Sequence, residues 1–185
     1  MRRSRTSSGP HWSPRACSRS RGNPHLRRRP RPTRPTASTA YPQETKGTHM
    51  LQGIDPLLTG DLLKHLDEMG HSESVVIVDA HFPAAGLADR LVTLPGTTAP
   101  EVVAAIRSVL PLDDVSAVDL MTSADGTVLD VQHELLEAAG VGQEDARFVD
   151  RFAFYDVAAE GYLIVRTGET RKYGNALLRK GIVTA

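Results

Sequence analysis

Two kinds of apolar pattern alternate along the chain from position 59 onward. Between residues 62 and 69 the apolar positions follow a helical spacing, and Thr59 has the side chain of a helix N-cap. Gly70 stands where a helix C-terminus favours a residue with positive φ. The next run, 74–79, is apolar between its ends, which is typical of a buried strand. The pattern therefore predicts a helix followed by a strand.

The same alternation continues to the end of the chain. Thr98 and Glu101 have the spacing of a capping box, and Pro100 lies in the first turn of a helix that reaches Leu110. The further predicted elements are a strand over 115–121, a helix over 131–139 ending at Gly140, a short strand at 148–149, a helix over 151–159, and strands over 162–166 and 176–178. Alternating helices and strands predict an α/β fold, and we expect a layered single domain with a largely parallel sheet.

Charge divides the chain into two parts. Residues 1–49 contain twelve Lys or Arg and one acidic residue, whereas residues 50–185 contain ten basic and 21 acidic residues. The overall charge of zero therefore combines a segment of +11 with a segment of −11. The basic segment is rich in Arg, Pro and Ser and has no apolar periodicity. We expect 1–49 to be a disordered tail and 50–185 to be the domain.

Three interpretations of residues 1–49 stay open. An Arg-rich arm could bind nucleic acid through phosphates, although the acidic remainder argues against a continuous basic surface. The composition also resembles an organelle transit peptide, but it lacks the amphipathic apolar face that such a peptide needs. Alternatively, the native start is Met50, where the patterned domain begins, and the preceding residues are dispensable.

Composition argues against several kinds of site. The only cysteine is Cys17, so we expect neither a disulfide framework nor a metal–thiolate cluster. No segment has the roughly 20 apolar residues of a membrane helix, which favours a cytoplasmic protein. Phosphate loops, dinucleotide fingerprints and nucleophile elbows do not occur in the sequence. We therefore expect no metal and no cofactor.

Polar residues collect where predicted elements end, which is where α/β folds place functional groups. The four segments are 69–71, 79–84, 151–155 and 167–175. They supply two histidines, an aspartate, an arginine and a Tyr-Gly-Asn sequence. This set suits general acid/base chemistry and hydrogen bonding to a polar small molecule, and it contains no evident nucleophile.

Structural roles compete with functional ones in each segment. His71 could stabilise the end of the preceding helix through its dipole, and Asp79 could cap the next segment. His81 could be an ordinary surface or core histidine, and the aromatic residues of 151–155 could pack in the core. Residues 173–175 could form a simple turn. The histidines and Asp79 lack the tight spacing of a metal site.

Taken in order, these segments resemble the L-fucose mutarotase and D-ribose pyranase family of sugar-anomer isomerases. The resemblance is carried by Met-Gly-His at 69–71, Asp-Ala-His-Phe-Pro at 79–83, Arg-Phe-Ala-Phe-Tyr at 151–155, Thr-Gly-Glu at 167–169 and Lys-Tyr-Gly-Asn at 172–175. It covers essentially all of residues 50–185 and none of 1–49. Each motif is weak alone, but their common order over a whole domain is specific.

The resemblance implies a D-ribose pyranase-like fold and an isomerase that interconverts anomers of a free monosaccharide without metal or nucleotide. It implies that His71 is the proton donor. The sugar-binding residues that it implies are Asp79, Arg151, Tyr173, Gly174 and Asn175. Additional candidates in the same motifs are His81, Phe82 and Tyr155. It also implies a ring-like homo-oligomer with sites between subunits.

The sequence at 79–83 favours the fucose branch of this family. The ribose branch has a Gly-Leu pair where His81 and Phe82 stand here, so L-fucose is the expected substrate. Two alternatives stay open: a D-ribose pyranase, and a non-catalytic sugar-binding or regulatory protein on the same scaffold.

Overall fold

The structure, a computed structural model, describes residues 51–183. The expectations for residues 1–49 therefore lie outside the described residues. In chain order the elements are α1 (Gly60–Glu68), β1 (Ser74–Val78), α2 (Ala84–Leu87), β2 (Leu91–Leu94), α3 (Ala99–Arg107), β3 (Val118–Met121), α4 (Asp130–Ala139), the 3₁₀ turn η1 (Gln143–Asp145), β4 (Arg147–Val149), α5 (Arg151–Ala159), β5 (Leu163–Thr167) and β6 (Ala176–Arg179). Among the described helices, none is long and apolar enough to cross a membrane.

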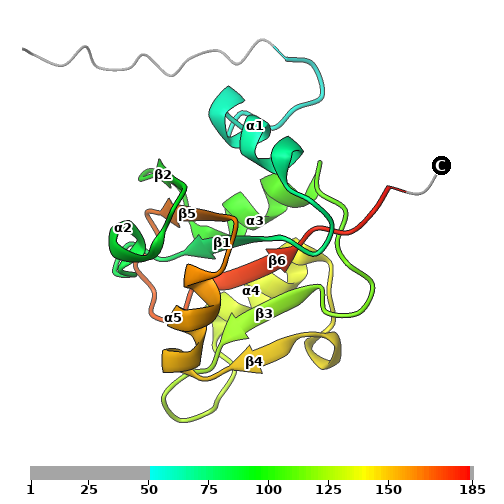
Figure 1. Cartoon of the computed structure of the whole chain (residues 1–185). Helices are drawn as coiled ribbons and strands as arrows, with labels where there is room; N and C mark the ends of the chain where they lie inside the picture. Colours follow the sequence, from blue (N-terminus) through cyan, green and yellow to red (C-terminus); the bar gives the residue numbers. More distant parts are fainter. Residues whose placement is uncertain (1–50, 184–185) are drawn as a thin grey trace, which may run out of the picture. The chain divides into compact units, whose positions relative to one another are not determined.

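The strands form one six-stranded sheet in the order β2-β5-β1-β6-β3-β4 (Figure 1). Strands β2, β5 and β1 pair in parallel, as do β3 and β4. Strand β6 lies between β1 and β3 and runs antiparallel to both. Five strands therefore share one direction, which agrees with the expected largely parallel sheet. The connection from β5 to β6 is short and passes the end of β1, so the chain returns antiparallel, because a parallel return needs a long crossover.

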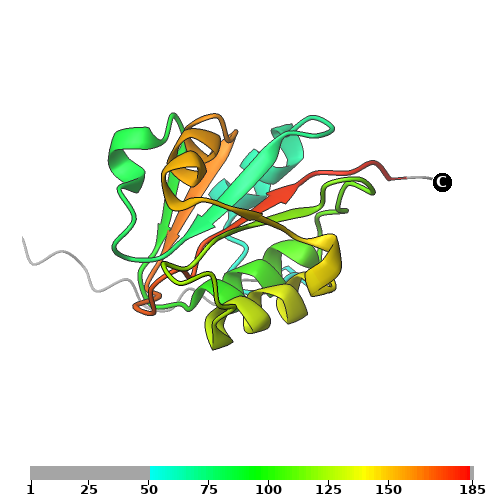
Figure 2. The same ribbon diagram turned by 90° about the horizontal axis from the view of Figure 1, so that it is seen from below.

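Helices cover both faces of the sheet, so the domain has three layers (Figure 2). Helices α1, α3 and α4 pack on one face, with Val75 and Ile77 of β1 among the buried residues there. Helices α2 and α5 pack on the other face against Val76 and Val78. This alternation along β1 explains why the strand reads as a continuous apolar run: both of its faces are buried.

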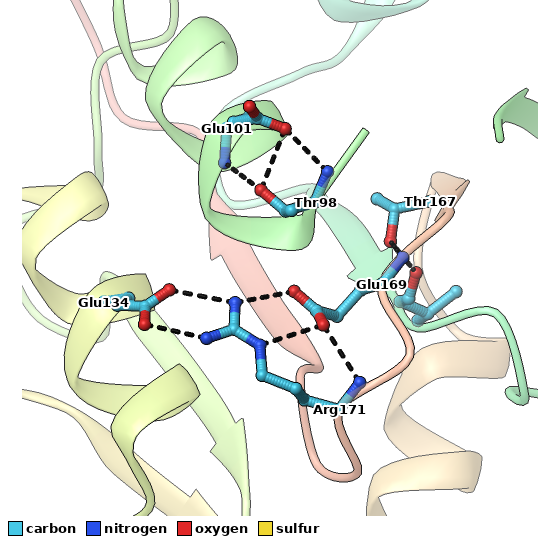
Figure 3. Close-up of polar contacts among 7 residues, drawn as sticks. Thr98, Glu101, Glu134, Thr167, Glu169 and Arg171 are labelled. Carbon is cyan, nitrogen blue, oxygen red and sulfur yellow. Dashed lines mark hydrogen bonds and ion pairs between the residues drawn. The ribbon is translucent and has the colours of Figure 1, made fainter. Parts of the chain in front are cut away.

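Local sequence signals explain several helix ends. The Thr59 side chain accepts a hydrogen bond from the Leu62 amide at 3.2 Å, and Thr98 and Glu101 form the predicted capping box (Figure 3). Gly140 ends α4 with a φ of 69°. The expectation for Gly70 is wrong, because α1 ends at Met69 in an extended conformation. The positive φ in this loop belongs to Ser72, at 65°.

Other sequence expectations need smaller corrections. Helix α2 and edge strand β2 have no counterpart in the predicted elements, because both are only four residues long. Strand β3 begins three residues later than expected, and Val115 is 92% exposed. Phe152 is also exposed, at 71%, so it does not belong to the core, whereas Phe154 is fully buried.

Candidate active site

A pocket opens at the end of the sheet where β1 and β3 finish, beside the start of β6 and the first turn of α5. Its volume is about 420 Å³. The lining residues are Asp79, His81, Phe82, Met121, Arg151, Tyr155, Lys172, Tyr173 and Asn175. Because β1 and β3 are parallel, their carboxyl ends meet at this edge, which is the usual ligand-binding edge of such sheets.

Asp79 and Asn175 form a buried polar pair inside the pocket. The Asn175 Nδ2 atom donates to Asp79 Oδ2 at 2.9 Å, and Asn175 Oδ1 accepts from the Asp79 amide at 2.9 Å. Asp79 Oδ1 also accepts from the His81 amide at 2.9 Å. These bonds hold both side chains in one orientation, so the remaining oxygen lone pairs can accept hydroxyl protons of a ligand.

The opposite wall combines a cation with aromatic surface. Arg151 Nε donates to the Tyr155 hydroxyl at 3.1 Å, and this bond raises the pKa of the Arg151 guanidinium, so it stays charged. The ring of Tyr155 packs against Phe82, with centroids 5.3 Å apart. Phe82 in turn packs edge-to-face on Phe154 of the core. The wall therefore presents fixed donors beside an apolar surface that suits the C–H face of a ring.

The segment from Glu169 to Asn175 forms the third wall. Its Arg171 side chain binds two carboxylates, those of Glu169 and Glu134, and we call this group of three residues the clamp. Arg171 donates through Nε and Nη2 to the buried carboxylate of Glu169, at 3.0 and 2.8 Å. Its two terminal nitrogens also bind Glu134 of α4 at 2.7 and 2.9 Å (Figure 3). Tyr173 has a φ of 64°, a conformation that is costly for a bulky residue unless the surroundings enforce it. Arg171, two residues before Tyr173, anchors this segment to α4.

Other hydrogen bonds tie the Glu169 segment to the end of β1. The backbone oxygen of Glu169 accepts from the Ala80 amide at 2.8 Å, next to Asp79. Thr167 Oγ1 donates to the Val78 oxygen at 2.9 Å and accepts from the Glu169 amide (Figure 3). The Arg171 guanidinium holds the pKa of both the Glu169 and Glu134 carboxyls below their ordinary value, so the network stays ionised at neutral pH.

Substitution of Arg171 should weaken ligand binding without stopping chemistry. Arg171→Met leaves the buried Glu169 carboxylate unpaired and releases the strained Tyr173 backbone, so we expect KM to rise about tenfold, which corresponds to about 1.4 kcal/mol. Arg171→Lys keeps the charge but cannot bind two carboxylates in fork geometry. Its KM should therefore lie between the values for the wild type and for Arg171→Met. Steady-state kinetics on both variants checks this; an unchanged KM for Arg171→Met would show that the wall does not depend on the clamp.

His71 lies at the opposite edge of the sheet from the pocket. It precedes β1, whereas Asp79 follows it, and a five-residue strand spans about 16 Å. The His71 side chain is 57% exposed, and its Nε2 atom is 3.4 Å from Asp113 Oδ2. The structure therefore does not bring His71 to the pocket of its own chain.

The structure brings seven of the predicted site residues into the pocket lining, and Gly174 stands between two of them, Tyr173 and Asn175. A Cβ on Gly174 would lie 2.8 Å from Glu169 Cγ, so the close approach requires glycine. Sequence reasoning missed Met121 and Lys172 as lining residues. The end of the predicted strand over 115–121 was an available signal for Met121, and Lys172 is part of a quoted motif. In the described part of the chain, no group of three potential metal ligands occurs.

The fold and the pocket define a class: a three-layer α/β domain with a small-molecule site at the carboxyl edge of its sheet. A family model described as the RbsD / FucU transport protein family matches residues 52–183. An L-fucose mutarotase of Histophilus somni (strain 2336) is 40% identical over 141 residues, which cover 72% of this chain and 97% of that protein. The chain belongs to the RbsD / FucU family.

Two solved structures are similar to the described fold. The fucose mutarotase of Streptococcus pneumoniae in complex with L-fucose has a TM-score of 0.67 and 33% identity, covering 72% of this chain and all of that chain. Bacillus subtilis RbsD complexed with D-ribose has a TM-score of 0.57 and 19% identity, covering 69% of this chain and 95% of that chain. The second likeness concerns the fold alone.

Proposed function

We propose that this protein is an isomerase that interconverts the α and β anomers of L-fucose. The observation that carries the proposal is the pocket formed by Asp79, Asn175 and Arg151 in a chain that is 40% identical to an L-fucose mutarotase. The similar Streptococcus pneumoniae enzyme was solved with L-fucose. A pocket of about 420 Å³ is large enough for one monosaccharide.

The pocket residues have the chemistry to hold a sugar by its hydroxyl groups. Asp79 accepts hydroxyl protons, Arg151 and Lys172 donate to hydroxyl oxygens, and Asn175 fixes the orientation of Asp79. Tyr173 and Phe82 supply the surfaces against which ring C–H groups pack. With its hydroxyls fixed, the sugar presents its ring oxygen and anomeric hydroxyl to an acid/base group.

Mutarotation needs two proton transfers. A proton is delivered to the ring oxygen while another leaves the anomeric hydroxyl, and the bond between the ring oxygen and the anomeric carbon breaks to give the open-chain aldehyde. Rotation of the aldehyde and the reverse transfers then close the ring with the opposite configuration. A histidine with an ordinary pKa near 6.5 suits both transfers near neutral pH, and such catalysis contributes roughly 10²–10⁴-fold.

His71 is our candidate for this group, and a neighbouring subunit would supply it. The pocket edge exposes Phe152, and the edge that carries His71 exposes Val115, Ile182 and Val183. Contact between these two different surfaces is heterologous, and repeated heterologous contacts that close form a ring. A homo-oligomer of this kind places one subunit's His71 at the next subunit's pocket. The family resemblance supports the same arrangement.

The sugar preference should be graded. Phe82 offers an apolar contact to the C6 methyl of L-fucose, and one methyl contact is worth only about 1–3 kcal/mol. We expect the greatest acceleration of anomer exchange with L-fucose, less with D-galactose and least with D-ribose. Saturation-transfer NMR at equal enzyme concentration measures the exchange rate of each of the three sugars. If pyranose–furanose exchange of D-ribose is accelerated most, the protein is a ribose pyranase; if every sugar binds without acceleration, it is a non-catalytic sugar-binding protein.

A further inference from the structure

We propose that Asp113 is a positioning residue for His71, which orients the imidazole and selects its tautomer during proton transfer. The proposal rests on the proposed function, in which His71 is the acid/base group. Asp113 belongs to none of the motifs that point to the sugar site. It follows α3, and it reaches His71 only through the tertiary fold.

The contact between the two side chains is direct. His71 Nε2 lies 3.4 Å from Asp113 Oδ2, and the aspartate side chain is only 14% exposed. A carboxylate at Nε2 favours the tautomer with a proton on that nitrogen. The Nδ1 atom then carries the lone pair that removes a proton from a sugar hydroxyl. An acid/base histidine oriented by a third group is a recurring arrangement in proton-transfer sites.

Asp113 is itself fixed in one orientation and in its charged form. Its Oδ2 atom accepts a hydrogen bond from Ser72 Oγ at 2.9 Å, and its Oδ1 atom accepts from the Val115 amide at 3.1 Å. These bonds, with the Val115 amide as the main cause, lower the pKa of the Asp113 carboxyl. The group is therefore a carboxylate at neutral pH, and it has a fixed oxygen available for the imidazole.

The end of the chain brings the two loops together. The Ser72 amide donates to the Lys180 oxygen at 2.8 Å, and the Asp113 amide donates to the Arg179 oxygen at 3.0 Å. Lys180 Nζ also binds the Met69 oxygen at the end of α1 at 2.6 Å. Residue 181 must be glycine, because a Cβ there would lie 2.2 Å from the Leu112 oxygen. The segment after β6 thus lies between the His71 loop and Asp113.

The backbone beside His71 is strained, and the Asp113 contact is one of the bonds that maintain it. Ser72 has a φ of 65°, a conformation that is unfavourable for a residue other than glycine. The Ser72 amide and hydroxyl are both tied, to Lys180 and to Asp113. A strained backbone conformation that several hydrogen bonds maintain is typical of a loop that holds a side chain for function.

Asp113→Asn is the direct test, because it removes the charge and keeps the size of the side chain. We expect kcat for L-fucose anomer exchange to fall about tenfold or more with little change in KM, since a misoriented group slows the transfer without affecting the sugar pocket. Asp114→Asn is the matched control: the adjacent carboxylate is exposed, and its loss should leave the rate unchanged. Imidazole ¹⁵N NMR should show His71 protonated at Nε2 in the wild type and a mixture of tautomers in Asp113→Asn.

A double variant separates positioning from a merely structural role. If Asp113 acts through His71, His71→Asn combined with Asp113→Asn should be no slower than His71→Asn alone. A further loss of rate in the double variant would assign Asp113 a structural role and overturn the proposal. So would a wild-type rate for Asp113→Asn in a protein that His71→Asn inactivates. Undiminished exchange in His71→Asn would refute the assigned role of His71 itself, and an inactive wild-type protein would refute the proposed function.

Discussion

His71→Asn should reduce L-fucose anomer exchange by about 10²-fold or more while leaving the fold intact. The reason is that asparagine keeps a polar side chain but cannot exchange a proton near neutral pH, and general acid/base catalysis contributes roughly 10²–10⁴-fold. The side chain is 57% exposed in the single chain, so its replacement removes little packing. Exchange NMR measures the rate, and circular dichroism with a thermal melt checks the fold. Near-normal exchange would move the role to His81 or Tyr173.

Mixing two defective variants tests whether the site is shared between subunits. Arg151→Met damages the pocket and His71→Asn damages the acid/base group, so each homo-oligomer should be slow. In an oligomer co-assembled from equal amounts, about a quarter of the sites combine an intact pocket with an intact neighbouring His71. Recovery of that fraction of the wild-type rate is the expected result. Absence of recovery, or a fully active monomer in sedimentation, would contradict the shared site.

Asp119→Asn should lower the free energy of unfolding by about 3 kcal/mol, near the low end of the cost of breaking a buried ion pair. Asp119 is fully buried on β3, and both of its oxygens accept bonds from Arg179 of β6, at 3.0 and 2.7 Å. Arg147 of β4 binds the same two oxygens. The variant leaves two arginines facing each other without a counter-charge. The loss is at the low end because Arg147 is half exposed.

The pH dependence of this loss identifies its cause. Burial by itself would raise the pKa of Asp119, but the hydrogen bonds and charges of Arg179 and Arg147 hold that pKa below its ordinary value. A carboxyl with a lowered pKa in the folded state stabilises the fold above its unfolded pKa of about 3.9, and the contribution disappears as the pH falls further. The difference from wild type should therefore be full at neutral pH and shrink below about pH 4.

Denaturant unfolding of Asp119→Asn and of a matched control measures this effect. Asp89 is exposed, so Asp89→Asn should change stability by less than about 0.5 kcal/mol. A loss for Asp119→Asn that equals the control, or that stays constant down to pH 3, would show that the two arginines do not depend on the carboxylate.

Much of the fold could be predicted from the sequence because its signals are local. A helix cap needs only the side chain at one position and the amides that follow it, so Thr59 and Thr98 indicated the starts of α1 and α3. The run before Asp79 indicated a strand buried on both faces. Short elements such as α2 and β2 gave no comparable signal, since four residues contain about one helical turn or two side chains per face.

The sequence by itself identified the candidate site residues and placed them at the ends of predicted elements. Only the tertiary structure decided how they are grouped. Asp79 and Asn175 meet because β1 and β6 are neighbours in the sheet, a pairing that depends on contacts distant in sequence. The same fold separates His71 from Asp79 by the length of one strand and brings it to Asp113. Periodicity reports which face of an element is buried, but the packing of the whole sheet sets which element ends come together.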